Sequence, residues 1–414
     1  MSASHDSPSR DDLISDCVHC GFCLPTCPTY VLWGEEMDSP RGRIQLMLQQ
    51  SQGEPLSPSM TAHFDACLGC MACVSACPSG VQYDKLITET RTMVEQVRPP
   101  AGRALRAAVF ALFPYPRRLR AAKAPLVGYQ WMGLPLKRRL PATLQTLVSL
   151  APPVRRAVAL PPLVHALGPR RARVGMLTGC VQHAFFPSVN AATARVLAAE
   201  GCDVVIPPSQ GCCGALSLHS GRSAEAARFA SALLDSFADV DFLIVNAAGC
   251  GSSLKEIAAL LPDDPRAAAL APKVRDLSEF LVELGPVAPR HPVPVAAAYH
   301  DACHLAHAQG VRAQPRALLR AIPGLDLREI PDPEICCGSA GIWNILNPGP
   351  AAALGDRKAR DVLSTGASLL VTANPGCLMQ IAAAASRAGA PLRLAHTAQV
   401  LDASIRGVRP EALS

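Results

Sequence analysis

Seventeen cysteines constrain this chain more than any other feature, because sixteen of them fall into sets of four. Two sets are compact: Cys17, Cys20, Cys23 and Cys27, then Cys67, Cys70, Cys73 and Cys77. Two sets are spread out: Cys180, Cys212, Cys213 and Cys250, then Cys303, Cys336, Cys337 and Cys377. Only Cys202 is left over, and we interpret it as a small buried hydrophobic residue. The pattern indicates metal binding rather than disulfides.

Each compact set has the pattern C-x-x-C-x-x-C-x-x-x-C-P, closed by Pro28 in the first set and by Pro78 in the second. Three thiolates at this spacing can bind three corners of a [4Fe–4S] cubane, and the fourth is better placed for the neighbouring cluster. The pattern therefore predicts two clusters with crossed ligands: Cys17, Cys20, Cys23 and Cys77 for one, and Cys67, Cys70, Cys73 and Cys27 for the other. A pair of zinc sites fits less well, because structural zinc usually takes separated C-x-x-C pairs.

The spread sets define a repeat, since each half has one cysteine, then Cys-Cys-Gly, then Gly-Cys. Short apolar segments alternate with alanine-rich ones, which predicts a parallel, Rossmann-like sheet in each half. The expected strands are Val174–Leu177, Asp203–Ile206, Phe242–Val245, Val295–Tyr299, Leu327–Ile330 and Leu369–Thr372. The expected helices are Ala191–Glu200, Ala224–Phe237, Arg316–Ala321, Ala351–Leu363 and Leu378–Arg387.

Several of these cysteines follow predicted strands, at the edge where parallel α/β folds build their sites. Gly214 and Gly338, after the paired cysteines, permit a tight turn with positive φ. The spread sets bind a cluster, act as a redox-active dithiol, or bind another metal. Near Cys303, the histidines His300 and His304 either hydrogen-bond the backbone at a strand end or deliver protons to a reducible organic acceptor.

Arginines and lysines are concentrated in two places. The segment Ser39–Arg43, before a helical stretch from Arg43 to Gln50, has two interpretations. Its arginines are either solvated at a helix start, or they raise the potential of a cluster or dock a partner.

From Arg98 to Arg173 the chain has fifteen basic residues and no Asp or Glu. With interleaved apolar residues, this connector either lies on an anionic membrane face or docks on an acidic partner subunit. No nucleic-acid motif accompanies the charge.

The expected fold is α+β or α/β with four parts. Residues 1–97 form a helical two-cluster ferredoxin-type domain, and residues 98–172 form the basic, proline-broken helical connector. Residues 173–290 and 291–414 form two Rossmann-like cysteine-rich domains. The N-terminal residues Met1–Asp16 do not have the pattern of a signal peptide, and prolines and arginines interrupt the most apolar stretch, Thr143–Gly168. We therefore expect a soluble or peripheral protein of the reducing cytoplasm.

Longer segments resemble a known family, the iron–sulfur subunits of glycolate oxidase. The resemblance runs from about residue 10 to residue 405, and the wider group includes lactate-utilisation and anaerobic glycerol-3-phosphate dehydrogenase subunits. It is carried by four segments: Asp16–Cys23, Ser39–Arg43, Tyr299–Leu305 and Ile335–Gly341.

The resemblance implies an electron-transfer subunit of a complex on the inner face of the cell membrane. A separate FAD subunit would oxidise glycolate to glyoxylate, and this chain would pass the electrons to a quinone. The resemblance assigns no catalytic residue and no FAD to this chain. The sequence agrees, since it has neither a G-x-G-x-x-G after a strand nor a P-loop.

The spread sets depart from a related cysteine pattern at one position. The Cys-Cys-Gly repeats also resemble those of heterodisulfide reductases, in which the last cysteine belongs to a C-x-x-C pair. Here the second position of that pair is Ser253 in one half and Gln380 in the other. Two clusters are therefore expected, both in the compact sets. The four thiolates of each spread set could still hold one further cluster. The alternatives are a lactate or glycerol-3-phosphate dehydrogenase subunit, a heterodisulfide-reductase-like thiol/disulfide enzyme, and a structural membrane anchor.

Overall fold

The computed structural model describes residues 8–123, 142–152 and 159–413. The N-terminal part is helical, and its elements are α1 (Arg10–Ser15), α2 (Pro28–Trp33), η1 (Glu36–Asp38), α3 (Pro40–Ser51), α4 (Pro58–Ala66), α5 (Ala72–Ser75) and α6 (Tyr83–Val97). Serine side chains cap the starts of α1, α3 and α4 by accepting a backbone N–H bond. Met47, Phe64 and Leu86 are fully buried in the core of this domain. These short helices position the two compact cysteine loops.

The connector continues as helices α7 (Pro100–Leu112), α8 (Pro116–Ala121) and α10 (Ala142–Leu150). Its basic residues Lys137, Arg138, Arg139, Arg155 and Arg156 lie outside the described residues. No helix in the described ranges is long and apolar enough to cross a membrane.

The first cysteine-rich module is built on a five-stranded sheet of order β1-β3-β2-β4-β5. The strands are β1 (Leu163–Val164), β2 (Ala172–Leu177), β3 (Cys202–Val205), β4 (Phe242–Val245) and β5 (Val274–Asp276). Strands β2 to β5 are parallel, and β1 joins β3 antiparallel from within the stretch assigned to the connector. The helices are α11 (Val181–Phe185), α12 (Pro187–Ala199), α13 (Ala215–Leu218), α14 (Ser223–Ser236), α15 (Ala248–Lys255), α16 (Ile257–Leu260), α17 (Pro265–Leu270), η3 (Ala271–Lys273) and α18 (Leu277–Leu284).

The second module has a four-stranded, entirely parallel sheet of order β7-β6-β8-β9. Its strands are β6 (Val295–Tyr299), β7 (Leu325–Glu329), β8 (Leu369–Thr372) and β9 (Arg393–His396). Its helical elements are η4 (His304–Ala308, a π-helical turn), α19 (Ala313–Arg320), α20 (Trp343–Leu346), α21 (Pro348–Ser364), α22 (Pro375–Arg387), α23 (Thr397–Arg406) and η5 (Pro410–Ala412). The prediction of two α/β modules with parallel strands is confirmed.

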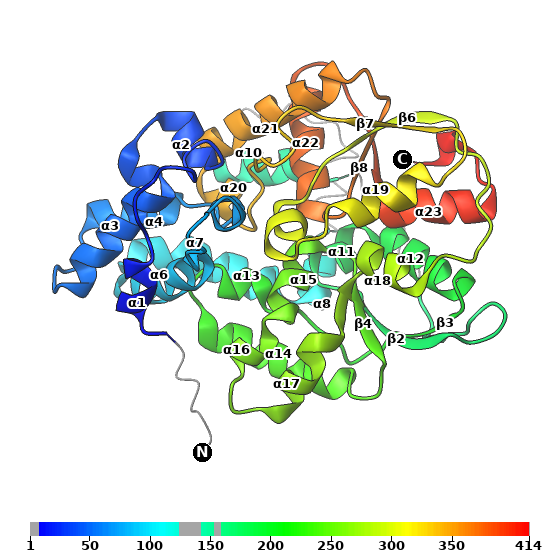
Figure 1. Cartoon of the computed structure of the whole chain (residues 1–414), viewed down its shortest axis with the longest axis horizontal. Helices are drawn as coiled ribbons and strands as arrows, with labels where there is room; N and C mark the ends of the chain where they lie inside the picture. Colours follow the sequence, from blue (N-terminus) through cyan, green and yellow to red (C-terminus); the bar gives the residue numbers. More distant parts are fainter. Residues whose placement is uncertain (1–7, 124–141, 153–158, 414) are drawn as a thin grey trace.

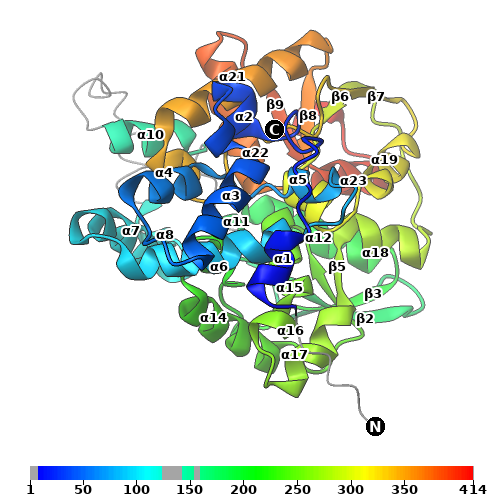
Figure 2. The same ribbon diagram turned by 60° about the vertical axis from the view of Figure 1, so that its left-hand side comes forward.

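The two modules share one hydrophobic core, to which both sheets contribute. Val174 of β2, Tyr299 of β6 and Leu401 of α23 belong to the same buried cluster. The N-terminal helices lie at one side of the molecule, next to helices of the two modules (Figure 1). In the turned view they come forward, with α10 near α21 and α7 beside α8 (Figure 2). The molecule therefore places the compact cysteine loops against the two modules.

Candidate iron–sulfur and thiol sites

The two compact cysteine loops share an unusual backbone. Both His19 and Gly69, two residues after the first cysteine of each loop, have positive φ, at 53° and 65°. Gly21 and Met71, two residues further on, also have positive φ. Such values are uncommon for residues with a side chain, and they cluster at functional sites. The repeated turns are the local geometry by which each loop gathers its thiols.

The fourth cysteine of each loop lies near thiols of the other loop. Burial raises the pKa of Cys17, and the thiol of Cys77 from the other loop adds to this rise. Burial likewise raises the pKa of Cys73 well above the usual value, and Cys27 from the first loop is among the thiols that add to it. Cys77 thus lies near the first loop, and Cys27 lies near the second. The predicted ligand sets require this arrangement, because each set takes one cysteine from the other loop.

Cys67 is buried but has polar neighbours. Its Sγ accepts an N–H bond from Gly69 at 3.3 Å, and the Tyr83 hydroxyl lies 3.7 Å away. Burial opposes ionisation of this thiol, but the guanidinium groups of Arg43 and Arg91 outweigh it and lower the pKa of Cys67. The surroundings therefore favour a thiolate at this position.

Arg43 is buried, so the interpretation of solvated arginines is wrong for this residue. Its side chain is 1% exposed and donates to the backbone oxygen of His63 at 2.7 Å and to Asp38 at 3.2 Å. Arg41 differs, since it is only half-buried, pairs with Glu36 at 2.6 Å and donates to the backbone oxygen of His19 at 3.0 Å. Arg41 thus contacts the first cysteine loop directly, whereas Arg43 acts on Cys27 and Cys67 through its charge.

The first spread set converges, although its members are far apart in sequence. The Sγ atoms of Cys180 and Cys212 are 3.7 Å apart, and Cys213 lies within hydrogen-bonding reach of Cys212 and Cys250. The backbone N–H of Gly214 donates to Cys212 Sγ at 3.4 Å. Gly214 has a φ of 82°, and a Cβ there would lie 2.7 Å from the backbone oxygen of Ala226, so the predicted glycine turn is confirmed.

The second spread set converges in the same way. Cys336 lies within hydrogen-bonding reach of Cys303 and Cys337, and Cys337 within reach of Cys377. The amide of Asn374 donates to Cys377 Sγ at 3.3 Å. Gly338 has a φ of 85° and packs against α21 as Gly214 packs against α14. Each module therefore gathers its own set of thiols.

These thiols suit iron–sulfur ligation. All seventeen cysteines lie in described residues, and none forms a disulfide. Thiols buried this deeply resist ionisation, and a positive partner such as cluster iron removes that penalty. Backbone N–H groups directed at Sγ atoms are also the kind of hydrogen bond that tunes cluster potentials. The donor chemistry and the burial both fit iron–sulfur clusters.

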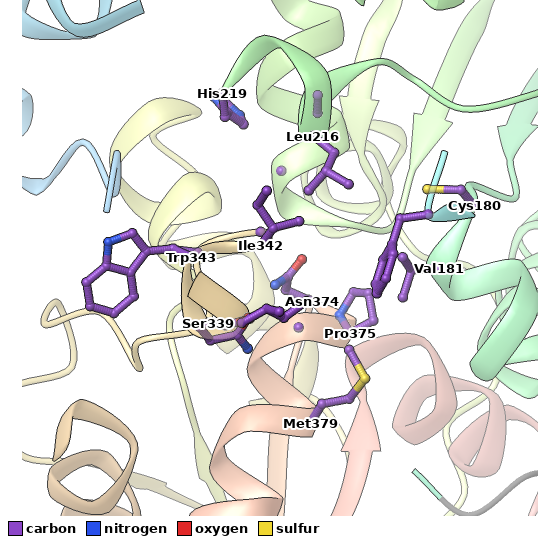
Figure 3. A pocket seen from close by; sticks show the side chains of 18 of the residues that line it. Cys180, Val181, Leu216, His219, Ser339, Ile342, Trp343, Asn374, Pro375 and Met379 are labelled. Carbon is purple, nitrogen blue, oxygen red and sulfur yellow. The ribbon is translucent and has the colours of Figure 1, made fainter. Parts of the chain in front are cut away.

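A cavity of about 710 Å³ lies between the two modules, and both spread sets line it. Leu216 and His219 approach it from the first module, and Ile342 and Trp343 approach it from the second (Figure 3). Parts of α7 and α10 complete the wall with leucine side chains, among them Leu112 and Leu147. The cavity is thus mainly apolar and lies between two groups of thiols.

The histidines near Cys303 join separate parts of the chain. His304 lies 2.8 Å from the backbone oxygen of Gly69 and 2.9 Å from Ser252 Oγ. His307 lies 2.7 Å from Ser75 Oγ. The predicted backbone bonds of His300 and His304 at a strand end differ from the structure. His304 contacts the backbone of a cysteine loop instead, and Nδ1 of His300 has no hydrogen-bond partner among the described residues. His219, which sequence reasoning missed, stacks edge-on against His304.

Connector side chains bind the N-terminal domain. Arg98 pairs with Asp65 at 2.8 Å and with Glu95 at 2.9 Å, and Arg106 pairs with Glu95 at 3.2 Å. Acidic residues of the same chain therefore pair with part of the positive charge of the connector.

The fold and the thiol sites define the class. This is an iron–sulfur protein with a dicluster domain and two cysteine-rich modules. The family description "4Fe-4S dicluster domain" matches residues 13–81, and "Cysteine-rich domain" matches residues 174–255 and 297–382. "Glycolate oxidase iron-sulfur subunit, linker region" matches residues 101–148.

Similar proteins narrow the class to a family. The "Probable glycolate oxidase iron-sulfur subunit" of Bacillus subtilis is 39% identical over 93% of each chain. The "Glycolate oxidase iron-sulfur subunit" of Escherichia coli is 36% identical over 90% of this chain and 91% of its own. "Lactate utilization protein A" of Halalkalibacterium halodurans is 32% identical over 56% of this chain and 96% of its own. The chain belongs to the family of glycolate oxidase iron–sulfur subunits, which confirms the resemblance found in the sequence.

Proposed function

We propose that this chain carries electrons within a glycolate-oxidising complex. A separate FAD subunit oxidises glycolate to glyoxylate, and this chain passes the electrons to a quinone. The observation that carries the proposal is the order of the thiol sites, which run from an exposed loop through a buried loop to the cavity between the modules. The substrate site and the catalytic residues belong to the partner.

The exposed loop is the proposed entry point. Cys20 is exposed, and the neighbouring side chains of Val18 and Phe22 are 67% and 66% exposed. Large apolar side chains this exposed, beside a cluster ligand, support docking of the flavin subunit at this loop. Cys17, Cys20, Cys23 and Cys77 would hold the first cluster here.

The buried loop continues the path. Cys67, Cys70, Cys73 and Cys27 would hold the second cluster, and Cys70 packs in one hydrophobic cluster with Cys336 and the partly buried Cys303. Each cluster, when bound, carries one electron at a time, so two in a row can accept the pair from a reduced flavin. The surrounding residues exclude water and, through Arg43 and Arg91, offset the negative charge of the thiolates.

The cavity is the proposed acceptor site. Its leucine, isoleucine and tryptophan lining suits the apolar ring of a quinone. His219 lines the cavity, and its Nε2 has no hydrogen-bond partner among the described residues. That nitrogen could therefore hydrogen-bond a quinone oxygen. The exposed arginines of α7 and α8, Arg103, Arg117, Arg118 and Arg120, are placed to contact an anionic membrane face or a partner subunit from the cytoplasmic side.

Glycolate is favoured over lactate as the donor of the complex. The glycolate oxidase relatives align with 90% or more of this chain, whereas the lactate-utilisation relatives align with little more than half of it.

The first test is the iron and acid-labile sulfide content of the anaerobic chain, with EPR of the dithionite-reduced form. Two interacting [4Fe–4S] signals are expected from the N-terminal cysteines. Further iron would place clusters in the modules, and zinc in place of iron at the N-terminal loops would overturn the proposal.

A cavity variant tests the acceptor site. In the complex, Leu216→Trp should fill the cavity and slow quinone reduction at least tenfold, while glycolate still reduces the clusters. Leu167→Trp, at an exposed position that does not line the cavity, is the matched control. Unchanged quinone turnover in Leu216→Trp would show that the cavity is not part of the electron path. In a separate assay, reduction of a disulfide by the isolated chain would favour the thiol/disulfide alternative.

A further inference from the structure

One histidine converges on the thiols of the second module. His300 follows the last residue of β6, and Cys377 lies in the first turn of α22, just beyond β8. One ring nitrogen of His300 and the Sγ atoms of Cys337 and Cys377 lie within 4.8 Å of one another, and all three residues are buried. Three donors at such separations are close enough to share one metal ion or to bind adjoining ions of a cluster.

One ring nitrogen of His300 lacks the hydrogen bond that a buried imidazole nitrogen normally makes. The residue is 1% exposed, and its Nδ1 has no partner among the residues that the structure describes. An unpaired buried nitrogen is costly, and each such atom in a native fold requires an explanation. Coordination to a metal would satisfy it. His304 and His307, on the same loop, have both ring nitrogens engaged.

The first module has no equivalent donor. His300 precedes Cys303 by three residues, and the residue in the same place before Cys180 is Leu177, which is buried and apolar. Nor does Gln380, at the second position of the last C-x-x-C pair, take this role. Its amide bonds Asn344 at 3.1 Å and the backbone oxygen of Ala351 at 2.7 Å. Within the described parts of the chain, only the second module places an imidazole nitrogen within 4.8 Å of two of its thiols.

We propose that His300 is a metal ligand, which gives the second module a mixed nitrogen and sulfur donor set with Cys303, Cys336, Cys337 and Cys377. A set of this kind binds a thiophilic metal, either iron in a cluster or a zinc ion. The first module would bind its metal through sulfur alone. The inference rests on metal binding by the second set of cysteines, and it does not depend on glycolate, quinone or the partner.

A buried lysine reinforces the difference between the modules. Lys358 of α21 is 1% exposed and donates to the backbone oxygen of Asp332 at 2.5 Å. Its charge acts on Cys336, Cys337 and His300. The buried residues of α14, the corresponding helix, are Ala226, Ala230, Leu233 and Leu234. Both centres have four thiolates and the imidazole is neutral, so Lys358 supplies the difference in charge between them, and Asp361 at 3.8 Å offsets part of it.

The test uses the whole chain, purified without oxygen and labelled with ¹⁵N only in histidine. Metal analysis first shows whether the centre is iron or zinc. For iron, pulsed EPR of the reduced chain should show a histidine ¹⁵N hyperfine coupling. For zinc, X-ray absorption at the zinc edge should show one imidazole with sulfur ligands. Coordination by sulfur alone, or an absence of metal in the second module of the otherwise loaded chain, would overturn the proposal.

Variants assign the nitrogen to one residue. His300→Cys keeps a ligand, so the metal should stay while the nitrogen signal is lost. His300→Ala should lose the metal of the second module and keep the N-terminal clusters. His307→Gln, on the same loop, should retain the signal. A nitrogen signal that persists in His300→Cys would assign the coupling elsewhere and refute the proposal.

Discussion

Arg43 shows how one residue can set the properties of a cluster site. Its guanidinium group is buried among Thr29, Asp38 and the backbone of His63, and its charge acts on Cys27 and Cys67. A cation fixed in a low-dielectric interior stabilises the extra negative charge of a reduced cluster. The sequence showed where this arginine lies in the chain, and the structure shows that it cannot reach water.

Replacing Arg43 by Met should lower the potential of the proposed cluster of Cys67, Cys70, Cys73 and Cys27. For a separation of roughly 8 Å and an effective dielectric constant of about 20, the lost interaction is about 2 kcal/mol. This energy corresponds to about 90 mV for a one-electron couple. EPR-monitored redox titration measures the shift.

The matched control is Arg41→Met. Each arginine pairs with a carboxylate, but Arg41 is partly exposed and solvent screens its charge, so its removal should shift the potentials much less. Arg43→Lys keeps the charge and should lie close to the wild type. If Arg43→Met retains both clusters and their potentials, the electrostatic role of this arginine is refuted.

At the scale of elements, a histidine joins helix α23 to the first module. His396 ends β9 and caps α23, where its Nδ1 accepts the backbone N–H of Ala398 at 3.1 Å. Its Nε2 donates to the backbone oxygen of Asn246, just beyond β4, at 2.8 Å. The first bond needs the neutral ring, because a protonated Nδ1 cannot accept the N–H of Ala398. Burial lowers the pKa of His396 to about 4.

This cap should make folding stability depend on pH. In the unfolded chain a histidine titrates near 6.5, so below that pH the unfolded state binds a proton that the folded state excludes. Stability should therefore fall as the pH drops from about 6.5 towards about 4, by up to about 3 kcal/mol from this residue. Urea unfolding at several pH values measures the slope.

His396→Asn is the comparison variant, because asparagine also caps helices but does not titrate in this range. Its stability should fall less steeply than that of the wild type between pH 6.5 and pH 4. Equal slopes in the two proteins would contradict the assignment to His396.

At the scale of the whole molecule, the N-terminal domain contacts both modules through specific hydrogen bonds and close packing. Arg91 donates to the backbone oxygen of His219 at 3.0 Å, and the indole of Trp343 donates to that of Asp65 at 3.1 Å. Gly221 lies against α6, where a Cβ would meet the backbone oxygen of Arg91 at 2.2 Å. These contacts hold the buried cysteine loop against the second set of module thiols.

Gly221→Ala should loosen this docking. Its φ of 79° is strained for alanine, and the new methyl group collides with backbone that cannot yield. We expect a loss of about 2–4 kcal/mol in the free energy of unfolding. Slower electron transfer from the N-terminal clusters to the modules should accompany it. Gly349→Ala, where nothing lies within 4 Å and φ is ordinary, is the control. Equal stability of the two variants would refute the contact.

Much of the fold could be predicted because it depends on local patterns. The strands Phe242–Val245, Val295–Tyr299 and Leu369–Thr372 were predicted with the bounds that the structure gives. Helices α12, α21 and α22 begin three or four residues earlier than predicted, because a proline opens each one and the alanine pattern starts later. Short strands such as β1 and β5 carry too few residues to show a period, and only pairing with neighbours makes them strands.

The sequence by itself determined the chemistry of this protein, because cysteine spacing is local and leaves few alternatives to iron–sulfur binding. Only the tertiary structure decided which groups surround the thiols. The burial of Arg43, the unpaired nitrogen of His300 and the cavity between the modules all arise where segments distant in sequence meet. Burial and electrostatic environment are properties of the packed chain, so no spacing rule could reveal them.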